Sequence, residues 1–101
     1  MIAVIFEVEP HPEHKKAYLK IAASLRETLV QIDGFISIER YQSLNSEGRM
    51  LSLSFWETEA AIAKWRENLE HQMAQEKGKS CLFKGYRLRV ANVARDYGME
   101  S

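Results

Sequence analysis

Apolar and polar side chains alternate over residues 2–9, which is the period of a β-strand with one buried face. The apolar positions on that face are Ile2, Val4, Phe6 and Val8. Ile5 places an apolar side chain on the opposite face as well. Pro10 and Pro12 are expected to end the strand and open a helix, because proline is tolerated in the first helical turn.

From Glu13 onward the spacing of apolar residues changes to three and four, the period of an amphipathic helix. The predicted apolar face consists of Tyr18, Ile21, Ala22, Leu25, Leu29 and Ile32. Asp33 and Gly34 are expected to end this helix, since glycine enters the left-handed C-terminal conformation at little cost.

Two further strands are predicted over 35–42 and 50–56, and the polar stretch between them, 44–49, makes them a hairpin. Thr58 is a candidate N-cap for a second helix. That helix is expected to end at Gly78, and its apolar stripe is Ile62, Trp65, Leu69 and Met73. A last strand is predicted over 86–95.

The order β-α-β-β-α-β is typical of the ferredoxin-like split βαβ fold, an α+β fold whose four-stranded antiparallel sheet carries both helices on one face. Residues 1–101 are expected to form this single domain. The first two strands have apolar residues on both faces, and the helices cover only one. We therefore predict a homodimer joined sheet to sheet.

The charge balance of the chain limits the kinds of partner that it is expected to bind. Fourteen basic and fourteen acidic residues cancel, so no overall field favours nucleic acid or a membrane surface. No apolar run approaches the roughly 20 residues of a membrane span. Cys81 is the only cysteine, which fits a reducing, cytoplasmic setting.

The second predicted helix carries a polar stripe beside its apolar one. Asn68, His71, Gln72 and Gln75 are spaced 3, 1 and 3 apart, next to Trp65. Such mostly uncharged hydrogen-bonding groups either line a cavity or form a solvated face. A histidine with an ordinary pKa near 6.5 is a natural general base at neutral pH, and pairing with Glu67 one turn earlier is the structural alternative.

Two segments resemble the antibiotic biosynthesis monooxygenase superfamily: FWETEAAIAKWRENLEH at 55–71 and LFKGYRLRVANVARDYG at 82–98. The resemblance implies a dimeric α+β barrel built from two ferredoxin-like subunits. Members of the superfamily include cofactor-independent monooxygenases of aromatic polyketides, quinol monooxygenases, haem-degrading enzymes and a signal-molecule isomerase. The family therefore does not define one reaction.

Site candidates follow from the resemblance and the polar stripe together. Trp65, Asn68 and His71 are the catalytic candidates, with Trp65 shaping the cavity or simply packing in the core. The candidates for substrate contact are Gln72, Gln75, Tyr41 and Tyr86. For the two tyrosines, a place in the core or in a dimer interface is the alternative.

The basic residues Arg87, Arg89 and Arg95 share one face of the last predicted strand. They would bind an anionic group of a substrate or pair with acidic residues such as Glu7 and Glu39.

The expected function is oxidation of a small electron-rich phenol or quinol by O2, without a cofactor or metal. His11 and His14 lack an evident third ligand for a metal, and Cys81 has no adjacent base in the sequence. A non-catalytic, dimeric small-molecule-binding module is the main alternative. Haem degradation is a weaker one, because Glu7 and Gln75 stand where haem-degrading relatives have Asn and His.

Overall fold

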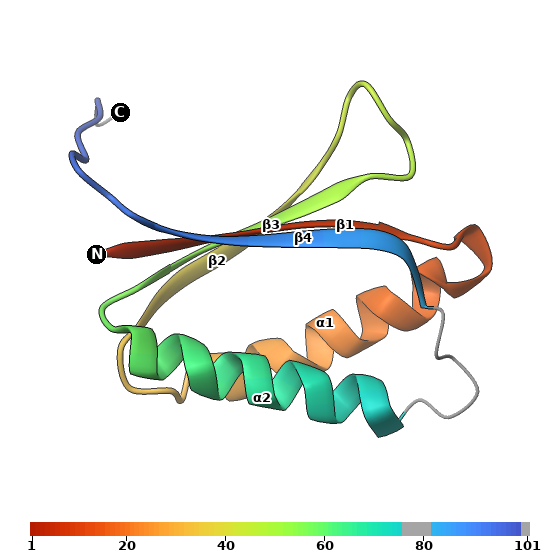
Figure 1. Cartoon of the computed structure of the whole chain (residues 1–101), viewed down its shortest axis with the longest axis horizontal. Helices are drawn as coiled ribbons and strands as arrows, with labels where there is room; N and C mark the ends of the chain where they lie inside the picture. Colours follow the sequence, from red (N-terminus) through yellow and green to blue (C-terminus); the bar gives the residue numbers. More distant parts are fainter. Residues whose placement is uncertain (76–81, 100–101) are drawn as a thin grey trace.

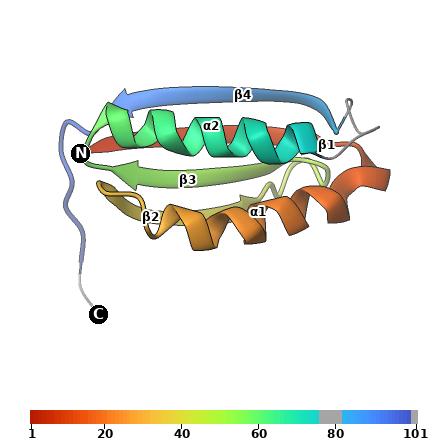
Figure 2. The ribbon, with the colours of Figure 1, turned by 90° about the horizontal axis from the view of Figure 1, so that it is seen from below.

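The computed structural model describes the backbone of residues 1–75 and 82–99, and the side chains of residues 1–70 and 82–99. Its elements are β1 (Ile2–Pro10), a 3-10 turn η1 (Pro12–His14), α1 (Lys15–Leu29), β2 (Phe35–Gln42), β3 (Met50–Trp56), α2 (Glu59–Gln75) and β4 (Phe83–Asn92). The strands form one antiparallel sheet in the order β2-β3-β1-β4. Both helices lie on the same face of it (Figure 1, Figure 2). The predicted ferredoxin-like fold is confirmed.

The boundaries of the predicted elements are mostly right, and the errors are at the end of α1, described below, and in β4. This strand covers Phe83–Asn92 rather than 86–95. It starts earlier because β4 pairs with β1 as far as Phe83 opposite Pro10. The Phe83 ring also packs edge-on against Tyr18 of α1, with the centroids 5.5 Å apart. Arg95 therefore lies beyond the strand. The predicted end of the second helix at Gly78 falls outside the described residues.

The predicted end of the first helix at Asp33 and Gly34 is wrong, because α1 ends at Leu29 with Val30 as its C-cap. Gly34 instead lies in the turn that leads into β2, where it adopts a φ of 98° close to the start of α2. The backbone amide of Ala61 donates to Thr58 Oγ1 at 3.2 Å, which confirms Thr58 as the N-cap of α2.

The core lies between the helices and the inner face of the sheet. Val4 and Trp56 are fully buried there, together with Leu29 of α1. Two serines of β3 also face inward, and one of them accepts a hydrogen bond that the core needs: Trp56 Nε1 donates to Ser54 Oγ at 2.8 Å. The buried indole N–H is thus satisfied without water.

The outer face of the sheet carries apolar side chains that no helix covers. Ala3 and Ile5 of β1 lie opposite Phe55 and Leu53 of β3, and Ile5, Leu53 and Phe55 are half-buried on this open surface. Further along the same face the side chains are charged, and Glu7 of β1 lies opposite Arg87 of β4. The outer face therefore has an apolar half around Ile5, Leu53 and Phe55, which Arg89 and Glu39 flank on the neighbouring strands, and a charged half beyond it.

Replacing Gly34 by Ala should destabilise the protein. A Cβ at this position would lie 3.2 Å from the Cβ of Ala61, and the positive φ strains any L side chain. We expect the free energy of unfolding to fall by about 1–3 kcal/mol. Gly98→Ala is the control, because a Cβ there meets nothing within 4 Å. Urea unfolding of both variants at one protein concentration tests this, and equal midpoints would contradict it.

Candidate functional site between α2 and β4

A pocket of about 470 Å³ lies between α2 and β4 on the inner side of the sheet. Its lining residues are Phe6, Arg66, Leu69, Glu70, Phe83, Tyr86, Arg87 and Leu88. The register of the sheet explains the floor, because Phe6 of β1 stands directly opposite Leu88 of β4 and both side chains point toward the helices. The volume falls in the range of about 300–1,000 Å³ that small-molecule sites occupy.

Aromatic rings build the floor and support it from behind. The Phe6 ring meets Trp65 edge to face at 6.2 Å, and lies 5.8 Å from the ring of Tyr86. Trp65 is only 3% exposed and also packs on Trp56 at 6.3 Å. Trp65 is not among the lining residues, so it supports the floor through Phe6 within the described part of the chain. Its direct contact with a substrate remains a prediction.

The other candidates on α2 are placed differently from Trp65. Asn68 is half-buried. Since it follows Arg66 by two residues, it lies about 200° around the helix from that pocket residue and on the opposite flank. The backbone of α2 is helical through His71, Gln72 and Gln75, but the side chains of these three lie outside the described residues. The roles predicted for these three residues therefore stay predictions.

The two candidate tyrosines lie on opposite faces of the sheet. Tyr86 faces inward, lines the pocket and is 65% exposed. Tyr41 lies on the outer face of β2, opposite Leu51 of β3, and its hydroxyl is 3.5 Å from a carboxylate oxygen of Glu39. The predicted contact of each tyrosine with a substrate, and the alternative of a place in the core or a dimer interface, stay predictions.

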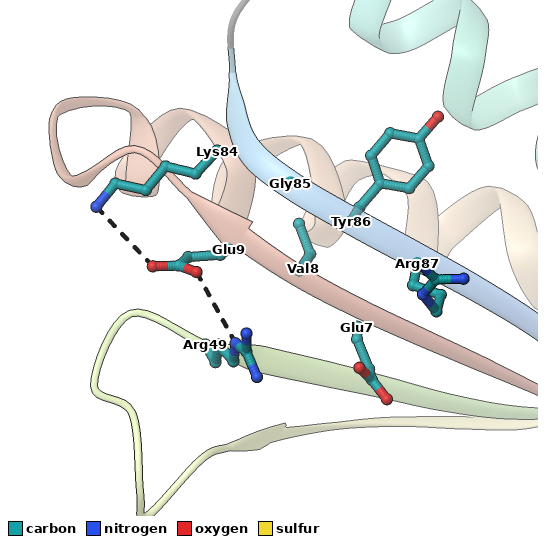
Figure 3. Close-up of a pocket in the computed structure, with 8 residues that line it drawn as sticks. All are labelled: Glu7, Val8, Glu9, Arg49, Lys84, Gly85, Tyr86 and Arg87. Atoms are coloured by element: carbon teal, nitrogen blue, oxygen red, sulfur yellow. Dashed lines mark ion pairs between the residues drawn. The ribbon is translucent and has the colours of Figure 1, made fainter.

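A second hollow, of about 240 Å³, lies on the charged half of the outer face (Figure 3). Glu9 stands between two cations there, 3.8 Å from Arg49 and 3.9 Å from Lys84. In Figure 3 the ring of Tyr86 points away from these charges, toward the helix layer. Because its charges pair with one another, this hollow is a weaker candidate for a substrate than the pocket beneath α2.

Arg89 and Glu7 form the shortest ion pair described on the outer face, with Nη1 2.9 Å from Oε1. The prediction that the arginines of the last strand pair with acidic residues is confirmed for Arg89. The same contact holds Glu7 on the face away from the pocket.

The described side chains hold no group of three or more His, Cys, Asp or Glu that could bind a metal ion. The imidazoles of His11 and His14 have centroids 6.3 Å apart. Cys81 lies outside the described residues. Among the described helices, none is both long enough and apolar enough to cross a membrane.

The sequence alone did not indicate three of the residues that line the pocket, Arg66, Glu70 and Leu88. Arg66 and Glu70 form an i,i+4 ion pair at 3.5 Å, a pattern that ordinarily indicates a solvent-exposed helix face. Leu88 belongs to the inward-facing set of β4. Pairing the predicted first and last strands antiparallel would have placed it opposite Phe6 and indicated the floor.

A buried phenol lies behind Phe83. Tyr18 is 3% exposed, and burial raises its pKa above the usual 10.0, while the guanidinium of Arg40 opposes the rise through its charge and a hydrogen bond. The net effect is that the neutral phenol is favoured at this position.

The fold and the pocket define the class: a small α+β domain with a ligand-sized site between a helix and an edge strand, apolar at its floor and charged at its opening. The chain belongs to the antibiotic biosynthesis monooxygenase family, whose model matches residues 1–77.

Two curated relatives and one solved structure show the range of similarity. The chain is 50% identical over 93 residues to the jasmonate monooxygenase ABM of Pyricularia oryzae, covering 92% of this chain and 43% of that protein. It is 34% identical over 93 residues to the uncharacterized protein YqjZ of Bacillus subtilis, covering 92% and 79%. A putative antibiotic biosynthesis monooxygenase from Deinococcus radiodurans matches with a TM-score of 0.81 over 100% of both chains, at 12% identity. The chain spans less than half of the jasmonate monooxygenase.

The raised pKa of Tyr18 predicts a pH dependence. A group whose folded pKa lies above its unfolded value stabilises the fold below pH 10.0, and this contribution is lost as the pH rises through the folded pKa. In a titration of phenolate absorbance, one of the four tyrosines should ionise above pH 10.0, and Tyr18→Phe should remove that step. Tyr97→Phe, at an 85% exposed position, is the control. Loss of the late step in the control variant would contradict the assignment.

Proposed function

We propose that this chain is a monooxygenase that oxidises a small electron-rich organic compound with O2, without a bound cofactor, in the pocket between α2 and β4. The observation that carries the proposal is the ligand-sized pocket of about 470 Å³, with an aromatic and aliphatic floor, in a chain of this family. An apolar wall admits O2 and limits water, and the few polar groups at the opening can orient a substrate.

The electron balance restricts the substrate. When one oxygen atom of O2 enters the product and the other leaves as water, four electrons are needed. A methylene that becomes a carbonyl supplies all four, since CH2 and O2 give C=O and H2O. A quinol that becomes a hydroxyquinone does the same. A substrate of either kind needs no external reductant, which is why a phenol, a quinol or an enolisable ketone is the class proposed.

The first step is removal of a proton to give a phenolate or enolate, which then passes an electron to O2. His71 is the proposed base, and Gln72 and Gln75 are the proposed hydrogen-bonding partners of the anion. Asn68 lies on the flank of α2 away from Arg66, so its proposed contact with the anion requires a substrate that extends past this pocket. Tyr86 contributes a phenolic hydroxyl on the opposite wall of the pocket. The name of the relative from Pyricularia oryzae adds jasmonate, an enolisable cyclopentanone, to the substrates worth testing.

We extend the proposal to assembly: a second copy of the chain covers the apolar half of the outer face. The half-buried Ile5, Leu53 and Phe55 lie together there without a covering helix. An isologous contact between two such faces would remove this surface from water.

Filling the pocket should stop turnover without unfolding the protein. Leu88→Trp places a large side chain on the floor, and we expect oxygen uptake with hydroquinones, anthrone-type phenols or jasmonate to fall at least about tenfold, or 1.4 kcal/mol in barrier. Val90→Trp is the matched control, on the same face of the same strand but outside the lining set, and it should retain uptake. Purified protein is measured with an oxygen electrode after subtraction of autoxidation.

The same assay tests the base, since His71→Ala should lower turnover about a hundredfold or more. Equal oxygen uptake by wild type and Leu88→Trp would show that the reaction does not take place in this pocket. Substrate binding without uptake in the wild type would favour the non-catalytic binding module.

A charge on the outer face should separate the two copies. Leu53→Asp would place an unpaired carboxylate in the proposed interface, where its desolvation opposes association. Sedimentation equilibrium should give twice the chain mass for wild type and the mass of one chain for the variant. Leu44→Asp, at a fully exposed hairpin position, should remain a dimer. A wild type that sediments as a single chain would refute the interface.

A further inference from the structure

The pocket between α2 and β4 has an apolar interior and a charged opening. Phe6 and Leu69 are 4% and 9% exposed. The side chains of Arg66 and Glu70, one turn of α2 apart, are 66% and 69% exposed on the same pocket. The interior of the pocket is therefore lined by hydrocarbon groups, and ionised groups lie at its solvent-exposed opening.

The ionised groups of the described lining are two arginines and one glutamate, so the opening carries a positive excess. Arg66 lies on α2 and Arg87 on the facing strand β4. Arg87 also borders the hollow on the outer face, because β4 is an edge strand of the sheet. Arg66 also borders another, shallower hollow on α2, with Ala63, Glu67 and Glu70. Unlike Arg87, which stands on the outer face of the sheet, Arg66 is on the helix that covers the inner face, and Arg87 adds positive potential at the rim.

The partner of Arg66 is held loosely. Its Nε lies 3.5 Å from one oxygen of Glu70, and both side chains are about two-thirds exposed. Such exposed i,i+4 pairs are weak, and they lack the two parallel hydrogen bonds that a guanidinium forms with a well-placed carboxylate. A ligand carboxylate whose body fills the pocket can therefore displace Glu70 from Arg66.

From these observations we infer that the pocket selects a substrate with an apolar ring or chain and one carboxylate, and that Arg66 binds the carboxylate at the opening. This inference rests on the proposed function and adds to it the substrate class and the residue that determines specificity. Arg66 is a binding residue for the end of the substrate that does not react. It orients the reactive carbon toward the floor at Phe6 and Leu88.

The test compares an acid with its neutral ester, which isolates the charge of the ligand. The probes are 1-naphthylacetate and its methyl ester, and binding is measured by quenching of tryptophan fluorescence or by calorimetry. Wild type should bind the acid about tenfold or more tightly than the ester, as expected for a charge-assisted contact at a partly exposed site. Added salt should weaken binding of the acid and leave the ester unchanged.

Three variants locate the effect. Arg66→Gln should bind the ester as wild type does and lose the preference for the acid. Lys64→Gln removes the same charge from an exposed position two residues away, about 200° around α2, and should keep that preference. Glu70→Gln should tighten binding of the acid, because it removes the competing carboxylate.

The outcomes distinguish this inference from the proposed function. Equal affinity of wild type for acid and ester, or a preference that survives in Arg66→Gln, overturns the role of Arg66 while oxygen uptake with neutral phenols can still stand. No binding of either probe overturns the pocket as a site, and the proposed function then fails with it. Loss of the preference in Arg66→Gln alone supports the inference.

Discussion

The edge-to-face packing of Phe6 on Trp65 fixes where α2 stands above the sheet, and the pocket depends on it. Trp65 touches Phe6 of β1 and Trp56 of β3, so the indole anchors the helix over the middle of the sheet. The edge strand β4 is left partly uncovered: its inward-facing Tyr86 and Val90 are 65% and 45% exposed, whereas Phe6 beside them is 4% exposed. The pocket is the space between a helix held over the centre and a strand at the edge.

The strand β1 carries this arrangement because it lies inside the sheet, between β3 and β4. Its even-numbered residues build the core and the pocket floor, and its odd-numbered residues build the outer face. Ile5 joins the apolar half of that face, and Glu7, in the charged half, bonds Arg89. A shift of one residue in register would exchange the two sets, so the pattern of this one strand specifies both surfaces at once.

Hydrophobic periodicity predicted the order of elements, this order indicated the ferredoxin-like topology, and the residue type of Thr58 predicted the cap of α2. The periodicity misplaced β4 by three residues, since the strand begins where Phe83 pairs with Pro10 of β1, a contact between segments far apart in the sequence. The pocket has the same non-local origin. Arg66 and Glu70 have the spacing of an ordinary surface pair, and only the position of β4 makes them part of an opening. The composition of a helix face does not show what lies across from it.

This geometry separates the residues that stabilise the fold from those that contact a ligand at the opening. Trp65, Phe6 and Trp56 are buried, and replacing any of them would leave a cavity that costs several kcal/mol, about 3–5 for an aromatic residue reduced to Ala. Arg66, Glu70 and Tyr86 are exposed and carry little of that stability, since exposed polar contacts are worth about 1 kcal/mol or less. Substitution at the opening can therefore change which compound is held while the aromatic support stays the same. On this argument a shared fold at 12% identity says little about substrate, and the residues around the pocket opening say most.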